Sequence, residues 1–176
     1  SLHDAEIDAI TSNNDEPTFE NTILAYDNAG QMLAQTELIF GMLCAAETNE
    51  RMQALQEQVM PLLSAHRDKI RLDEKLFARV KDVYDRRASL GLDAEQSRLL
   101  RKTYDAFVRS GALLDAGQKA RLKEINGELS LTAVKFGNNI LAENNNFALE
   151  LTADDLEGLP SGVRDAAREK AQALGK

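Results

Sequence analysis

The side chains that most often carry chemistry are scarce in this sequence. Its two histidines are His3 and His66, and its single cysteine is Cys44. A zinc site needs three or four converging Cys, His or carboxylate ligands, and no second histidine lies near His66 along the chain. A di-iron carboxylate bundle needs Glu-x-x-His on two helices, whereas the residue three before His66 is Leu63. The sequence therefore predicts no catalytic, cofactor-binding or metal-binding residue within these 176 positions.

The same residues have structural interpretations. His66 lies on an apolar helical stripe, so we expect a packed, half-buried side chain, whereas His3, near the start of the chain, is expected to be exposed. Cys44 ends another stripe and is expected to be a small core residue. The acidic pair of Asp154 and Asp155 falls in an expected first helical turn, where carboxylates compensate the helix dipole. The sequence also contains no glycine-rich phosphate loop, nucleophile elbow or Cys-x-x-Cys.

Composition and charge exclude several classes of protein. The net charge of −8 argues against a nucleic-acid partner, which would require clustered Lys and Arg. The sequence has no apolar run long enough to span a membrane, so no membrane partner is expected. One cysteine cannot form an internal disulfide, which favours a reducing compartment, and the cytoplasm is the default expectation. The chain begins at Ser1 rather than Met, which leaves an exported or anchored parent protein open.

Strong helix formers dominate, and short alternating runs typical of strands are nearly missing. We therefore expect an all-α fold: an elongated bundle of about six to seven helices, with long antiparallel helices, in a single domain over 1–176. Pro61 is expected to kink or split the second long helix, and a short extended segment is expected at 147–151. Thr152 is expected to cap a turn, and Asp73 and Asp93 are expected to cap the helices that begin at them. The predicted helices span 3–10, 19–46, 49–70, 73–90, 93–111, 115–146 and 160–176.

Thr18 is the predicted N-cap of the first long helix, with its hydroxyl accepting a hydrogen bond from the amide of Asn21. Apolar residues then recur at alternating steps of four and three from Phe19 to Cys44 and predict one uninterrupted helical stripe. Glu37 is the polar residue out of this pattern. It is expected to face either a partner such as an arginine or a solvent channel.

Four blocks of sequence resemble a known family. They are Pro-Thr-Phe-Glu-Asn-Thr-Ile at 17–23, Arg-Ser-Gly-Ala-Leu-Leu at 109–114, the helix at 121–141 with Phe-Gly-Asn-Asn-Ile-Leu at its end, and Asp-Leu-Glu-Gly-Leu-Pro at 155–160. In this order and spacing they resemble the thimet oligopeptidase and peptidyl-dipeptidase family of zinc metallopeptidases. The sequence from Phe136 to Phe147 most resembles that of the bacterial peptidyl-dipeptidases.

The resemblance implies a mostly helical enzyme with a deep channel that admits short peptides. In that family a zinc ion, held by the two histidines of H-E-x-x-H and a later Glu, activates water, and the motif Glu is the general base. No H-E-x-x-H occurs here, so no catalytic residue carries over. For this region the resemblance implies the N-terminal helical wall of the channel, with the blocks acting as caps, turns and packing positions. We expect an inactive fragment whose partners are the missing catalytic domain and, through the parent enzyme, short peptides.

Two other interpretations stay open at this point. The chain could be a non-catalytic helical binding module built on the same bundle, and the residues encoded after Lys176 in the native gene would distinguish this interpretation from the first. It could also be an oligomerising bundle, which the long stripe at 19–44 supports in part. An oligomer would show a mass that depends on concentration.

Overall fold

The structure is a computed structural model that describes residues 1–175, and these residues confirm the expected all-α fold. Seven α-helices have ten residues or more, and the described part of the chain contains no strand. Residues Ser1–Asn138 form one compact unit and a second begins at Asn139, within the longest helix. The expectation of a single domain stays a prediction. In chain order the elements are α1 (Leu2–Thr11), the π-helical η1 (Phe19–Leu24), α2 (Ala25–Asn28), α3 (Gln31–Ala46), α4 (Glu50–Arg71), α5 (Glu74–Asp85), α6 (Ala94–Arg109), α7 (Ala116–Asn146), the single 3-10 turn η2 (Asp154–Leu156) and α8 (Ser161–Ala173).

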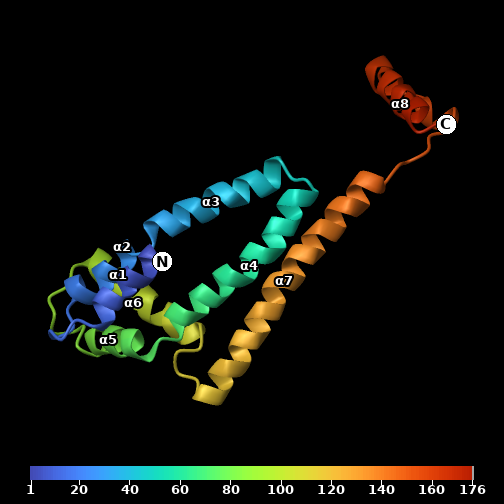
Figure 1. Cartoon of the computed structure of the whole chain (residues 1–176). Coiled ribbons are helices and arrows are strands. Elements are labelled where there is room, and N and C mark those ends of the chain that lie inside the picture. Colours follow the sequence, from blue (N-terminus) through green and yellow to red (C-terminus); the bar gives the residue numbers. More distant parts are fainter. Residues whose placement is uncertain (176) are drawn as a thin grey trace. The chain divides into compact units, whose positions relative to one another are not determined.

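The core of the first unit lies where α1, η1, α5 and α6 meet (Figure 1). Its largest fully buried side chains include Ile23 of η1, Leu76 of α5 and Phe107 of α6. Aromatic stacking extends this core: the rings of Tyr84 and Tyr104 are parallel with centroids 3.8 Å apart. These helices each present an apolar face because their buried residues recur at helical spacing.

The long antiparallel helices are also as expected. Helices α3 and α4 form a hairpin in which α4 returns along α3, and α7 runs back along α4 (Figure 1). Asn126 ties α7 to α4, since its side-chain amide donates to Asp68 Oδ1 at 2.8 Å and its carbonyl accepts from Ser64 Oγ at 3.3 Å.

Several predicted helix caps are confirmed. Thr18 accepts from the amide of Asn21 at 3.1 Å, and Asn21 Oδ1 accepts from the Thr18 amide at 2.8 Å, which completes a capping box. Asp73 and Asp93 cap α5 and α6 in the same way as Asn49 caps α4. The sequence could predict these helix starts because each capping side chain accepts a hydrogen bond from the amide three residues later.

The prediction of one uninterrupted helix over 19–46 is wrong. The chain breaks at Gly30, which has a φ of 75° and separates α2 from α3. The Gly30 amide donates to Glu6 Oε2 at 2.8 Å, and a Cβ there would lie 2.6 Å from His3 Cε1. Helix α1 therefore packs against the break, and a glycine is needed for both the backbone angle and the space.

Of the two outcomes expected for Pro61, a kink or a split, the split does not occur. Helix α4 continues from Glu50 to Arg71, because losing one backbone donor removes a small part of the bonding of a 22-residue helix. The expectation for Thr152 needs correction. Thr152 does not cap a turn by accepting a bond. Its hydroxyl donates to Asp155 Oδ2 at 2.7 Å, and the bonds from the Thr152 amide and hydroxyl lower the pKa of the Asp155 carboxyl.

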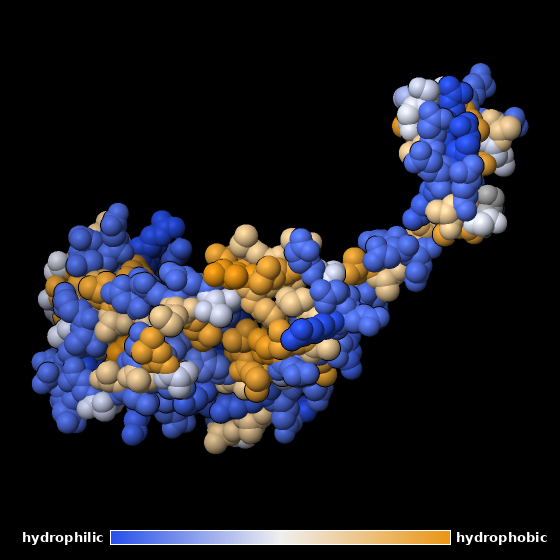
Figure 2. Space-filling model, turned by 45° about the horizontal axis from the view of Figure 1, so that its top comes forward, coloured by the Kyte–Doolittle hydropathy of each residue, from blue (hydrophilic) through white to orange (hydrophobic). Residues whose placement is uncertain are grey.

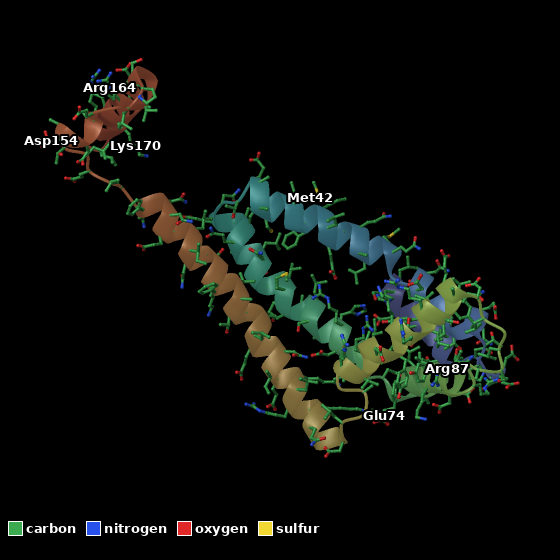
Figure 3. The ribbon with its side chains drawn as sticks, turned by 180° about the vertical axis from the view of Figure 1, so that it is seen from behind. Met42, Glu74, Arg87, Asp154, Arg164 and Lys170 are labelled. Carbon is green, nitrogen blue, oxygen red and sulfur yellow. The ribbon has the colours of Figure 1, made fainter. Side chains whose placement is uncertain are left out.

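The turn before α7 explains the block at 109–114. Gly111 has a φ of 94°, and a Cβ there would lie 2.7 Å from Leu122 Cδ2, so α7 packs directly over this glycine. Asp115 then caps α7 by accepting from the Gln118 amide at 2.8 Å, at the position where the sequence predicted this helix to begin. Figure 3 labels Glu74 at the start of α5, and its carboxylate accepts a bond from Lys119 Nζ of α7 at 3.0 Å.

Much of the apolar stripe of α3 does not face a core. No residue of α3 is buried, and Cys44 is half-buried, so the expectation of a core cysteine is wrong. Figure 2 shows hydrophobic residues gathered on the surface of the first unit. The large apolar residues of α3 with more than half of their surface exposed are Met32, Leu38, Ile39 and Met42.

The second unit contains the end of α7, η2 and α8. Helix α8 begins at Ser161 after Pro160, as the sequence predicted. The segment 147–151 contains no strand. No helix among residues 1–175 combines the length and apolar character required to cross a membrane.

Candidate functional site

The two histidines, 63 positions apart in the sequence, lie together in the structure. His3 Nδ1 of α1 and His66 Nε2 of α4 are 3.1 Å apart, and the rings meet edge to face with centroids 5.0 Å apart. His66 is half-buried, as expected. His3 was expected to be exposed and is instead half-buried, because α1 packs onto the end of α4 and the break at Gly30.

Charged residues lie on one side of the His3–His66 pair. Asp4 Oδ1 accepts from Lys69 Nζ at 2.8 Å and lies 3.8 Å from His66 Nδ1. The bond from Lys69, with further bonds from Ser1, holds the pKa of the Asp4 carboxyl well below its usual range. Burial, followed by the nearby His66, lowers the pKa of His3, which favours a neutral His3 at neutral pH.

The histidine pair borders a cavity of about 550 Å³ within the first unit, which we call the Arg71 pocket. Helices α1, α3, α4 and α7, together with α2 and the end of α6, supply its walls. Its lining residues are His3, Tyr26, Ala29, Gly30, Leu33, Ala34, Glu37, His66, Arg67, Asp68, Ile70, Arg71, Arg109, Ser110, Leu122 and Asn126.

Glu37 lies in this pocket and has an arginine partner. Arg67 Nη2 of α4 donates to Glu37 Oε2 of α3 at 2.7 Å. Of the two environments that the sequence left open for Glu37, the structure therefore shows the arginine. This ion pair joins the hairpin helices and neutralises one of the two carboxylates in the pocket.

Arg71 is held by rings rather than by anions. Its Cζ lies 5.6 Å from the centroid of Tyr26 and 5.3 Å from that of Phe107, within the range of cation–π contacts. Its Nη1 is buried without a hydrogen-bond partner. Arg109, at the end of α6, is a second guanidinium on the pocket and has no ion pair with any residue among 1–175.

Sequence reasoning missed Arg71 and gave Arg109 only a packing role. Arg71 lies in the last turn of α4, where a cation is favourable to the helix dipole, so no local pattern sets it apart. The aromatic rings that contact Arg71 belong to Tyr26 of α2 and Phe107 of α6, which lie 45 and 36 positions away in the sequence. Only the tertiary packing reveals the environment of this guanidinium.

The described residues around this pocket do not form a metal-ligand cluster or a paired nucleophile. The described residues contain no group of three or more His, Cys, Asp or Glu side chains placed to hold a metal ion. Cys44 does not line the pocket, and neither histidine has a hydrogen bond to a serine or threonine hydroxyl in the described part of the chain. That this sequence has no catalytic or metal-binding residue stays a prediction.

Comparison with known proteins shows that this chain is similar to part of several peptidases. No protein-family model matches it. The chain is 39% identical over 171 residues to the dipeptidyl carboxypeptidase of Escherichia coli (strain K12), which covers 94% of this chain and 25% of that protein. It is 38% identical over 172 residues to the dipeptidyl carboxypeptidase of Salmonella typhimurium, with the same coverage. A thimet-like oligopeptidase of Dictyostelium discoideum is 27% identical over 81% of this chain and 21% of its own length.

The chain thus spans about a quarter of the length of the dipeptidyl carboxypeptidases it matches. The similarity covers nearly all of its residues, which confirms the resemblance found in the four blocks. The chain belongs to the family of dipeptidyl carboxypeptidase and thimet-like oligopeptidase.

Proposed function

We propose that these residues are the N-terminal helical part of a zinc-dependent peptidyl-dipeptidase or oligopeptidase and form part of the wall of its peptide channel. The observation that carries the proposal is the 39% identity to a dipeptidyl carboxypeptidase over 94% of the chain. The parent enzyme would hydrolyse short peptides, and the cytoplasm is its expected compartment. The 176 residues themselves would be inactive.

The donor set of this chain supports assigning the zinc chemistry to another segment. A catalytic zinc in a peptidase takes three protein ligands and an open position for water. His3 and His66 are the only histidines, their facing nitrogens are bonded to each other, and no H-E-x-x-H occurs. These residues do not fit a catalytic zinc.

Exposed apolar surface supports a location inside a larger protein. On α3, Met32 and Leu38 are each 65% exposed and Met42 is 63% exposed, and α7 adds Leu129 and Phe136. Single exposed apolar residues are ordinary, but contiguous apolar faces usually mark interaction surfaces. The remaining polypeptide of a peptidase, including its catalytic domain, is the partner we propose for these faces.

A direct test measures zinc content and peptidase activity on the 176-residue chain. After dialysis against zinc and removal of free metal, the chain should hold no stoichiometric zinc, and it should not cleave a fluorogenic short peptide. Zinc near one ion per chain, abolished by His66→Ala, would overturn the assignment of the metal to another segment.

The exposed α3 face also favours a second candidate, a non-catalytic helical module that binds another protein. The two candidates differ in the coding sequence downstream of Lys176. A peptidase requires an in-frame H-E-x-x-H, whereas a binding module does not.

A further inference from the structure

The Arg71 pocket contains more positive charge than its own carboxylates neutralise. Three guanidiniums line it, those of Arg67, Arg71 and Arg109, against the two carboxylates of Glu37 and Asp68. Arg67 is paired with Glu37 at 2.7 Å, and Asp68 accepts from the Asn126 amide at 2.8 Å. Two guanidiniums are therefore left without an ion pair among residues 1–175.

Arg71 is placed as a fixed recognition group. The rings of Tyr26 and Phe107 contact its guanidinium, and Arg71 lines the cavity without an ion-pair partner among residues 1–175. A hydrogen bond to a charged group is stronger than one between neutral groups. An arginine already held by packing loses little side-chain entropy when it binds an anion.

The rest of the pocket is apolar and of ligand size. Leu33, Ile70 and Leu122 contribute aliphatic wall, and the volume of about 550 Å³ lies within the range of small-molecule sites. An inorganic anion would leave this wall without contacts. A carboxylate joined to an apolar group would use both parts of the pocket.

We propose that the Arg71 pocket binds a small apolar carboxylate, with the Arg71 guanidinium donating to the carboxylate oxygens and Arg109 adding a second charge. The apolar part of the ligand packs against Leu33, Ile70 and Leu122. This inference goes beyond the peptidase proposal and does not depend on it, because the pocket is formed entirely by residues of this chain.

The test is a titration of the 176-residue chain, with NMR detection of the arginine Nε–Hε groups. The probes are N-acetyl-leucine and N-acetyl-leucine amide, which share the apolar group and differ in the carboxylate. We expect the acid to shift the Arg71 signal saturably and the amide to leave it in place. Equal shifts with both probes, or no saturable shift with the acid, would overturn the proposal.

Three variants sharpen the result. Arg71→Gln should weaken binding of the acid by at least about tenfold, the loss expected for one charged hydrogen bond. Arg109→Gln, at an exposed position, should fold normally and give a smaller but measurable loss. Arg98→Gln changes an exposed arginine of α6 outside the pocket and should bind as the parent chain does.

Folding of each variant is checked by circular dichroism. If Arg71→Gln does not fold, Arg109→Gln decides the matter, and unchanged affinity in that variant contradicts the proposal. A loss of affinity in Arg98→Gln as large as in Arg109→Gln would also contradict it, because it would show a general response to charge.

Discussion

Gly30 shows how strongly one residue can depend on a distant segment. Its φ of 75° and the His3 ring, 2.6 Å from a Cβ placed there, both exclude a side chain. We expect Gly30→Ala to lower the free energy of unfolding by about 1–3 kcal/mol, the usual cost of such strain, measured by urea denaturation.

The matched control is Gly41→Ala. Gly41 lies inside α3, and a Cβ there meets nothing within 4 Å. Alanine favours a helix interior over glycine by about 0.5–1 kcal/mol, so this variant should be slightly more stable than the parent chain. A Gly30→Ala variant as stable as Gly41→Ala would contradict the packing of α1 against the break.

His3 is expected to make stability depend on pH. Burial and His66 lower its pKa below the ordinary 6.5 and outweigh the carboxylates of Asp4, Glu6 and Glu37, which act in the opposite direction. The unfolded chain therefore binds the His3 proton at a higher pH than the folded chain does. The contribution of His3 to stability is fully present above pH 6.5, and it is lost as the pH falls through the pKa of His3 in the folded chain.

Urea denaturation between about pH 7 and about pH 5 measures this effect, since that window contains the histidine titration. The free energy of unfolding should fall toward the acid end, and His3→Gln should remove part of that fall. If the free energy of unfolding depends on pH identically in His3→Gln and in the parent chain, His3 does not contribute to the pH dependence of stability.

At the scale of the elements, the cap of η1 can be tested by itself. Thr18→Ala removes the side-chain acceptor for the Asn21 amide, and we expect a loss of about 1 kcal/mol of stability, as is typical of helix caps. Thr132→Ala is a suitable control, because that hydroxyl only donates to Glu128 O within exposed α7. A control loss equal to that of Thr18→Ala would contradict the capping role.

The difference between local and long-range contacts explains how much of the fold the sequence could predict. The caps at Thr18, Asp73 and Asp93 were predictable, because each depends on residues three positions away. The break at Gly30 was not, because its cause is a contact with α1, 24 positions earlier. An apolar stripe continues through that break and predicts a single helix.

The candidate site was less predictable for the same reason. The half-buried state of His66 is explained by its position on an apolar stripe, but its contact with His3 depends on how α1 docks. Arg71 becomes distinctive only when Tyr26 and Phe107 are brought to it from two other helices. Sequence periodicity predicts which face of a helix is apolar, and it does not specify what covers that face.

At the scale of the whole molecule, the core and the α3 face should respond differently to substitution. Phe107→Ala empties a fully buried position and should cost about 3–5 kcal/mol of stability. Leu38→Gln changes a side chain that is 65% exposed and should alter stability by no more than about 0.5 kcal/mol in either direction. Urea denaturation measures both variants. A large loss in Leu38→Gln would show that the α3 face is covered within this chain or by a second copy of it.

The central claim is that these helices are part of a zinc peptidase whose catalytic residues lie elsewhere in its polypeptide. The most direct measurement is the native coding sequence continued in frame beyond Lys176. We predict an H-E-x-x-H motif and, downstream of it, a further Glu. A stop codon close to Lys176, with no such motif before it, would contradict the claim and favour the binding module.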